Sequence, residues 1–288
     1  MKFKNHLENI KVTLVDYPSM ERLKKYIPEF CSITWLENYN DLDQFMKDRN
    51  LTREELVHEM FEGRTLPTAL ETVRLTFFIE GLDLTTVTHI IRHRMFSFSA
   101  QSTDPVSMSN HDILDNDAFI EKPHLLERAH KICNEMNSLY DDALKEGLTF
   151  YDARHYMPRA KECKYFMSGN IKDFLGFIRV RLGVQCQPTS DRIVALLIRK
   201  EILKVYPFLK IPTEIIEWHY INAIDKKMNL NTYPPSKLHQ EKLKEIGKDW
   251  SNIKFSHPKP KDDYSHIKKF KKLEAELKWR IKIYLYLI

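Results

Sequence analysis

The chain has 288 residues, of which 43% are hydrophobic and 11% aromatic, a composition that suits one globular domain with or without an appendage. It contains no apolar run of about eighteen residues and no apolar signal segment at its start, so we expect a cytoplasmic protein without a membrane span. Its four cysteines are scattered, which indicates reduced thiols rather than disulfides or a zinc site.

The net charge of +5 is placed unevenly along the chain. Residues 225–288 hold sixteen Lys or Arg and eight Asp or Glu, which leaves −3 for the rest. Because the composition also changes to Lys, Asn and Pro beyond about residue 222, we divide the chain into a main domain, 1–222, and a basic C-terminal extension, 223–288. With only seven glycines there is no glycine-rich phosphate loop, so a dinucleotide cofactor would bind without a Rossmann fold.

In the first hundred residues, alternation predicts a strand over 10–15. Helices are predicted over 20–30, where Pro28 disturbs the end, over 41–49, and from a capping box at Thr52 to about residue 63. Aromatic and β-branched residues predict a second strand over 71–79. Asp83 is the expected N-cap of a helix whose last turn carries Arg92, His93 and Arg94, and a polar loop follows to Ser102.

In the second half, the acidic and aperiodic stretch 110–122 is predicted to be a loop. A long helix is predicted over 123–145, with an apolar stripe that we expect to pack in the core. The remaining predicted elements are helical turns over 150–156, a short strand over 164–168, and helices over 171–182 and 190–205.

The chain is organised around Arg92, His93 and Arg94. Two arginines this close cannot both enter the core, because a buried guanidinium without a partner is too costly. They need either a protein carboxylate or a ligand phosphate, and the polar run to Ser102 favours phosphate over a plain basic surface turn. His89 and His93 have a spacing that can hold a metal, but no third ligand is positioned, so we predict none.

Arg92-His93-Arg94, followed after seven residues by Ser102, resembles the signature of the flavin-dependent thymidylate synthases. The resemblance implies an α+β fold with a central sheet flanked by helices. It implies methylation of dUMP to dTMP, with methylenetetrahydrofolate as carbon donor and FAD, reduced by NADPH, as hydride carrier. It also implies a homotetramer in which active sites are shared between subunits.

Further family positions are present in order over roughly residues 10–205, and they imply roles for individual residues. Arg181 would activate the uracil ring at N3, where a guanidinium stabilises the developing anion. A segment that includes Glu71 would also approach the flavin. The residues implied at FAD are Ser32, Thr68, Arg92, His93, Arg94, Asn170, Lys172 and Gln185. Those implied at dUMP are His89, Arg92, Ala100, Gln101, Ser102, Thr103, Arg154 and Arg181.

Several of these positions depart from the family pattern. Ala100 stands where the family has a glutamate, Asp104 where it has an arginine, and His89 where it has a glutamine. Lys172 replaces an arginine and Gln185 a histidine. We therefore favour a divergent dUMP synthase, and keep open a relative acting on another pyrimidine nucleotide (dCMP methylation or hydroxymethylation) or an inactive homologue.

Two alternatives from other functional classes are less favoured. Cys186 lacks the arginine and proline surroundings of a cysteine-dependent synthase, so a structural cysteine is preferred. The basic run 268–272 and the aromatic residues after it would suit a non-catalytic homologue that binds nucleic acid. An amphipathic helix docked on the body is the preferred interpretation, so we do not expect nucleic acid as a partner.

Overall fold

The computed structural model describes residues 1–33, 36, 38, 41–61, 68–102, 108–182 and 189–209. Thr103, Asp104, Gln185, Cys186 and the proposed extension over 223–288 lie outside the described residues. The division of the chain into a main domain and a basic extension therefore stays a prediction.

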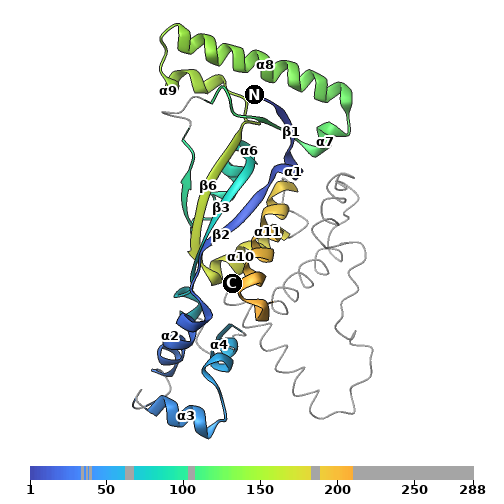
Figure 1. Cartoon of the computed structure of the whole chain (residues 1–288). Coiled ribbons are helices and arrows are strands. Elements are labelled where there is room, and N and C mark those ends of the chain that lie inside the picture. The colour runs from blue at the N-terminus through green and yellow to red at the C-terminus, as the bar shows by residue number, and fades with distance from the viewer. Residues whose placement is uncertain are drawn as a thin grey trace, which may run out of the picture.

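A four-stranded antiparallel sheet forms the centre of the described part (Figure 1). Its strands, in spatial order, are β2 (Lys11–Asp16), β3 (Arg74–Asp83), β6 (Glu162–Asn170) and β4 (Ser97–Ala100). A second, two-stranded sheet pairs β1 (Phe3–Asn5) in parallel with β5 (Ile113–Asp115).

Helices surround the sheet at its ends and on one face (Figure 1). Before β4 the chain forms α1 (His6–Asn9), α2 (Met20–Ser32), α3 (Leu42–Asp48), α4 (Arg53–Phe61), α5 (Thr68–Glu71) and α6 (Leu84–Ile90). After β5 it forms α7 (Asp117–Ile120), α8 (Pro123–Lys145), α9 (Phe150–Ala153), η2 (Arg154–Tyr156), α10 (Ile171–Leu182), α11 (Thr189–Val205) and η3 (Pro207–Leu209). The α+β class with a central sheet flanked by helices is confirmed.

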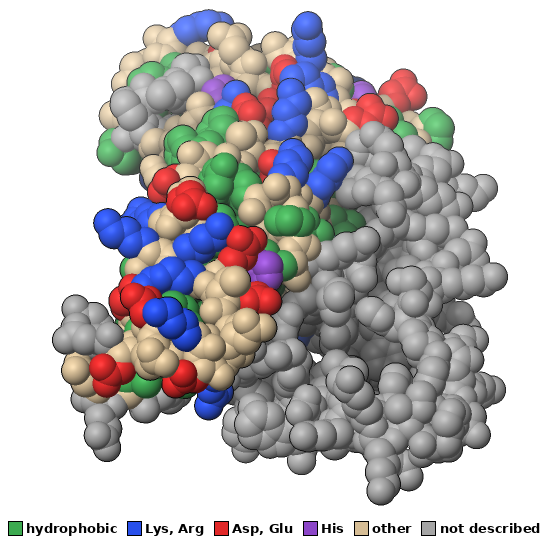
Figure 2. All heavy atoms as spheres, turned by 60° about the horizontal axis from the view of Figure 1, so that its bottom comes forward, with side chains coloured by type: hydrophobic (Ala, Val, Ile, Leu, Met, Phe, Trp, Pro, Cys, Tyr) green, Lys and Arg blue, Asp and Glu red, His purple; other side chains and the backbone are tan. Residues whose placement is uncertain are grey.

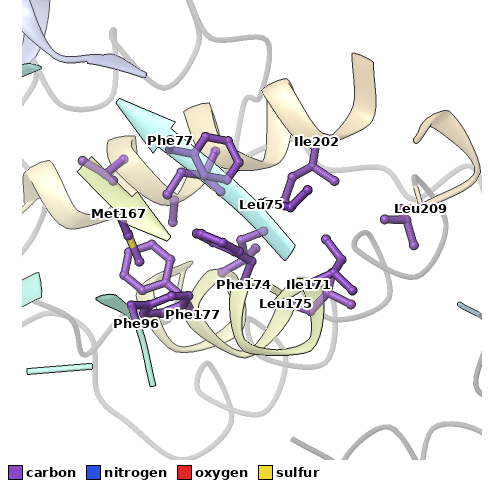
Figure 3. Close-up of a cluster of buried hydrophobic side chains, with 14 of the residues drawn as sticks. Leu75, Phe77, Phe96, Met167, Ile171, Phe174, Leu175, Phe177, Ile202 and Leu209 are labelled. Atoms are coloured by element: carbon purple, nitrogen blue, oxygen red, sulfur yellow. The ribbon is translucent and has the colours of Figure 1, made fainter. Parts of the chain in front are cut away.

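One face of the sheet carries the main hydrophobic core. Alternate residues of β3 and β6 point into it, among them Leu75, Phe77 and Met167, and all three are fully buried. Figure 3 shows these side chains meeting Phe174 and other residues of α10, with Ile202 of α11 beside them. The core therefore fixes α10 and α11 against the sheet, and these two helices provide half of the site described below.

The end of the molecule that carries α2, α3 and α4 is held together by ion pairs as well as apolar contacts. Lys24 pairs with Glu54 at 2.9 Å, and Arg53 pairs with Glu29 at 2.6 Å, so both pairs join α2 to α4. Figure 2 shows basic and acidic side chains interleaved on this face. The predicted capping box is confirmed, because the Glu55 carboxylate accepts the Thr52 N–H at 2.7 Å.

Two predictions about the central motif were wrong. Arg92, His93 and Arg94 lie in a turn after α6 rather than in its last turn, because the helix ends at Ile90 and the His93 N–H donates to the Ile90 carbonyl. The expected loop that follows contains β4, whose Ser-Phe-Ser-Ala sequence alternates as an edge strand does.

Other element bounds also needed correction. The expected loop over 110–122 contains β5 and α7, since Ile113 and Leu114 are buried where β5 pairs with β1. The second strand begins at Arg74, because residues 68–71 form α5, and the 164–168 strand is the middle of the longer β6. Helix α2 continues through Pro28 to Ser32. Of the expected core stripe on α8, only Tyr140 is fully buried.

Candidate active site

The turn after α6 is anchored by one aromatic side chain. Phe96 is buried, and its ring lies 4.7 Å from that of Phe174 and 5.9 Å from that of Phe177, both on α10 (Figure 3). A Cβ on Gly169 of β6 would stand 2.3 Å from the Phe96 ring, so only glycine admits this packing. Arg92 and Arg94 are exposed as a result, on either side of the half-buried His93.

The Arg181 guanidinium lies at the centre of a buried polar group. Its Nε donates to His93 Nε2 at 2.8 Å, its Nη1 to Asp191 Oδ2 at 2.7 Å, and its Nη2 to the His89 carbonyl at 3.2 Å. The Asp191 carboxylate is itself 2.5 Å from His89 Nδ1. We call these four residues, His89, His93, Arg181 and Asp191, the Arg181 cluster.

Three elements converge to build the Arg181 cluster. His89 and His93 come from α6 and the turn after it, Arg181 from the last turn of α10, and Asp191 from the first turn of α11. A cation at a helix C-terminus and an anion at a helix N-terminus both suit the helix dipole. A buried hydroxyl pair, Thr86 and Ser190 at 2.7 Å, joins α6 to α11 beside the cluster.

Burial decides the charge states within the cluster. It raises the pKa of Asp191 to about 6, although the neighbouring Arg181 and His89 oppose the rise. It lowers the pKa of His93 to about 4, and the adjacent Arg181 adds to this effect. His93 is therefore neutral at pH 7 and can accept the Arg181 Nε–H. Tyr165 of β6 is buried beside the cluster, and none of the described residues bonds to its hydroxyl.

A second group of predicted residues gathers where β6 ends and α10 begins. The Lys172 ammonium pairs with the Glu71 carboxylate at 2.6 Å, which joins α10 to α5. Asn170 accepts the Asp173 N–H at 2.8 Å and so caps the helix, and Thr68 is exposed on α5. The structure therefore brings together Thr68, Glu71, Asn170 and Lys172, which the sequence placed at the flavin. The side chain of Ser32, at the end of α2, lies outside the described side chains.

The predicted nucleotide residues of the central motif follow β4. Ala100 and Ser102 are exposed, and the Gln101 N–H donates to the Lys164 carbonyl at 2.8 Å. The Gln101 amide also lies 3.4 Å from His111 Nε2. Arg154 lies in η2, before β6, with its guanidinium 5.0 Å from the centre of the Tyr151 ring.

Two of the buried charged residues that sequence reasoning missed, Asp191 and Lys161, bear on the site. Asp191 stands in the first turn of α11, and this position near a helix start could have indicated an anion facing Arg181. Lys161 is fully buried, and its Nζ donates to the carbonyls of Met108, Ser109 and His111 at 2.8, 3.1 and 3.0 Å. No periodic pattern in the sequence indicated that contact.

The donor groups of the site fit an anionic dinucleotide better than a metal. Within the described ranges, no carboxylate pairs with the exposed guanidinium of Arg92 or Arg94, which leaves both available to phosphate. The described residues also contain no group of three or more His, Cys, Asp or Glu that could hold a metal. Among the described residues, Cys133 and Cys163 take part in no disulfide.

Comparison with known families decides the relationship. The profile of the family described as "Thymidylate synthase complementing protein" matches residues 13–208, more than half of the chain. The chain belongs to this family. The match includes the turn after α6 and the whole Arg181 cluster, so the resemblance that the sequence motif indicated is confirmed for a divergent member.

The curated relatives of this chain within the family are distant in sequence. The flavin-dependent thymidylate synthase of Thermococcus onnurineus is 27% identical over 188 residues, which cover 62% of this chain and 74% of the relative. That of Clostridium tetani is 25% identical over 219 residues, covering 69% and 85%. That of Pyrococcus furiosus matches over 122 residues, half of its own length.

A solved structure supports the fold of this family member. The UMP/dUMP methylase PolB from Streptomyces cacaoi, bound with 5-Br dUMP, superposes with a TM-score of 0.55 at 17% identity. The alignment covers 78% of this chain and 98% of PolB. Separately, none of the described helices is long and apolar enough to cross a membrane.

Proposed function

We propose that this protein methylates dUMP to dTMP, with methylenetetrahydrofolate as carbon donor and FAD, reduced by NADPH, as hydride carrier. The observation that carries the proposal is the Arg181 guanidinium, fixed by three acceptors within a chain that belongs to this family. A guanidinium has five N–H donors. Besides these three bonds, Nη1 lies 3.0 Å from His89 Nδ1, which leaves the second N–H of Nη2 for a ligand. That donor and the positive charge can stabilise the negative charge that develops on a pyrimidine ring as C5 is methylated.

The remaining residues would bind and orient the two ligands. The exposed Arg92 and Arg94, which pair with no described carboxylate, would hold phosphate oxygens of FAD, and Ser102 and Arg154 would hold the nucleotide phosphate. Thr68, Asn170 and Lys172 would line the flavin site from the other end of α10. When bound, FAD supplies the hydride, so the chain needs no redox group of its own.

The first experiment is an absorbance spectrum of the purified protein supplied with FAD, recorded before and after addition of dUMP. A flavin spectrum that changes with dUMP, followed by dTMP formation when methylenetetrahydrofolate and NADPH are added, is the expected result. A protein that binds no flavin would contradict the proposal.

A second candidate is methylation of another pyrimidine nucleotide. Two observations favour it: Ala100 replaces the glutamate of the family, and PolB, with a similar fold, is named a UMP/dUMP methylase. The same spectrum with UMP and dCMP distinguishes the candidates. A spectral response to UMP or dCMP and none to dUMP would select this second function. A product that carries a hydroxymethyl group would show that the enzyme hydroxymethylates its nucleotide and does not methylate it.

We further propose that the protein assembles as a homotetramer with shared active sites. On the sheet face opposite the main core, the Phe78 and Phe166 rings lie 4.8 Å apart, and Phe166 is 44% exposed. A second copy would cover such a face. Light scattering tests the assembly, and a mixture of Arg154→Ala and Arg181→Lys variants that regains activity would support sharing.

A further inference from the structure

The two side chains that face Arg181 from α6 and α11 form a pair of their own. His89 Nδ1 lies 2.5 Å from Asp191 Oδ2, and the Asp191 side chain has no exposed surface. The His89 side chain, by contrast, is 37% exposed. One end of the pair is thus buried beside Arg181, and the other reaches the solvent side of the cluster.

The contact with Asp191 favours a proton on Nδ1 of His89. Asp191 Oδ2 accepts from Arg181 Nη1, and an ionised carboxylate there also accepts a proton-bearing Nδ1. With Nδ1 as donor, Nε2 of the neutral imidazole is left as an acceptor. Arg181 Nη1 lies 3.0 Å from Nδ1 and 3.4 Å from Nε2. Because the carboxylate contact of Nδ1 is the shorter one, at 2.5 Å, we assign the proton to Nδ1, and Nε2 is then available to another proton donor.

The proposed reaction requires such an acceptor. When C5 attacks the methylene carbon of methylenetetrahydrofolate, the new carbon–carbon bond forms with electrons of the C5–C6 double bond. The electron pair of the carbon–nitrogen bond that breaks in the donor stays on the folate nitrogen. The C5–H bond then breaks, its electron pair restores the double bond, and the proton leaves. The neutral His93 cannot be that acceptor through Nε2, because this atom already accepts from Arg181 Nε.

We propose that His89 is the catalytic base that takes this C5 proton on Nε2, with Asp191 as its positioning residue. The inference rests on the proposed function and adds a role that the family resemblance does not contain, since the family has a glutamine at this position. His89 then passes the proton to solvent through its exposed edge.

The charges around the pair suit one proton transfer. His89 and Asp191 are faced by Arg181 from α10, by His93 from the turn after α6, by Asp83 from the start of α6 and by Tyr165 from β6. Arg181 and Asp191 offset each other while the ring and His89 are neutral. After the transfer, the imidazolium is balanced by the Asp191 carboxylate, which lies 2.5 Å from His89 Nδ1.

His89→Gln tests the base directly, because it installs the family's own residue and keeps a side chain of similar length. We expect kcat with dUMP to fall about 10²- to 10⁴-fold, the usual contribution of a general base, with KM for dUMP little changed. We also expect an isotope effect on kcat with C5-deuterated dUMP to appear or increase, since proton removal becomes slow. A structural role for His89 would not produce that effect.

Asp191→Asn tests the positioning residue, and Ser190→Ala is the control. Imidazole NMR of the free protein should show the Nδ1–H tautomer of His89, and Asp191→Asn should abolish it and lower kcat. Ser190→Ala removes the hydroxyl pair at the same helix junction and should leave kcat within about twofold, because it does not touch the base.

The outcomes separate this inference from the proposed function. A wild-type enzyme that turns over dUMP, together with a His89→Gln variant of equal kcat and no isotope effect, would overturn the base alone. An Nε2–H tautomer in the free protein would also overturn it. A wild-type enzyme that releases no tritium from [5-³H]dUMP would overturn both the function and the base.

Discussion

The Arg181 guanidinium and the Asp191 carboxylate meet at 2.7 Å where the end of α10 faces the start of α11, and both side chains are buried. The residue expected to act on the substrate is thus also part of the helix packing. In a buried ion pair each charge is tolerated only because the other is present. Changes at Arg181 therefore affect stability as well as chemistry, and the two effects have to be measured separately.

The first prediction concerns this ion pair. Asp191→Leu leaves a buried guanidinium without its anion and should lower the free energy of unfolding by about 3–5 kcal/mol. Arg181→Met should cost a similar amount, whereas the double variant should lose clearly less than the sum of the two, because no lone charge remains. Urea unfolding followed by circular dichroism provides the values. Additive losses would show that the two charges do not depend on each other.

The second prediction is a pair of opposite pH effects. The pKa of Asp191 is raised from 3.8 to about 6, so its contribution to stability is present below pH 4 and is lost as the pH rises to 6. The pKa of His93 is lowered from 6.5 to about 4, so its contribution is lost as the pH falls from 6.5 to 4. The two slopes offset each other in the wild type over this window.

Single variants should reveal each slope. In Asp191→Asn, stability should fall towards pH 4 relative to the wild type, by up to about 1.4 kcal/mol per pH unit. In His93→Gln, whose amide oxygen can still accept from Arg181, stability should instead rise towards pH 4 relative to the wild type. Urea midpoints at several values between pH 4 and 6.5 test both. Parallel curves for all three proteins would mean that neither group is perturbed.

The third prediction concerns the contact between Gly169 and Phe96. Gly169→Ala places a Cβ 2.3 Å from the Phe96 ring, so the ring has to move and the turn that carries Arg92 and Arg94 moves with it. We expect a stability loss of about 1–3 kcal/mol and weaker FAD binding. Gly147→Ala, where nothing lies within 4 Å, is the control for FAD binding and should leave the affinity unchanged, although its φ of +88° makes alanine costly to stability there.

A smaller side chain at position 96 should relieve the clash with the added methyl group. Phe96→Leu combined with Gly169→Ala should recover part of the FAD affinity, because leucine leaves room for the added methyl group. Fluorescence titration with FAD measures the affinity. A Gly169→Ala protein that binds FAD like the wild type would show that the position of Phe96 does not control the turn.

Local patterns predicted most of the fold. Asp83 accepts the Thr86 N–H at 2.6 Å as an N-cap should, and the Thr52 capping box forms as expected. The errors lie where tertiary contacts decide. No local sequence pattern indicates that Ile113 and Leu114 pair with the N-terminal strand β1. None indicates that the burial of Phe96 places Arg92 in a turn outside the helix.

The site was only partly predictable, again because tertiary contacts decide which residues meet. Family spacing identified Arg181, His89 and His93, which the structure brings together, but it says nothing of partners outside the aligned pattern. Asp191 reaches Arg181 only because α11 packs against α10, an arrangement of two helices that no spacing in the sequence expresses. The role of Lys161 depends likewise on three carbonyls fifty residues away.

The last prediction concerns that buried lysine. Lys161→Met removes the donor that binds the carbonyls of Met108, Ser109 and His111, and it should lower the free energy of unfolding by about 3 kcal/mol. Lys164→Met is the matched control, on β6 directly after this segment, since the Lys164 side chain is 45% exposed and pairs with Glu80 at 3.3 Å. Its loss should stay within about 0.5 kcal/mol, as for most surface ion pairs.

Because His111 also contacts Gln101, Lys161→Met should raise KM for dUMP while Lys164→Met does not. Equal unfolding energies and equal KM values for the two variants would show that Lys161 does not hold this segment.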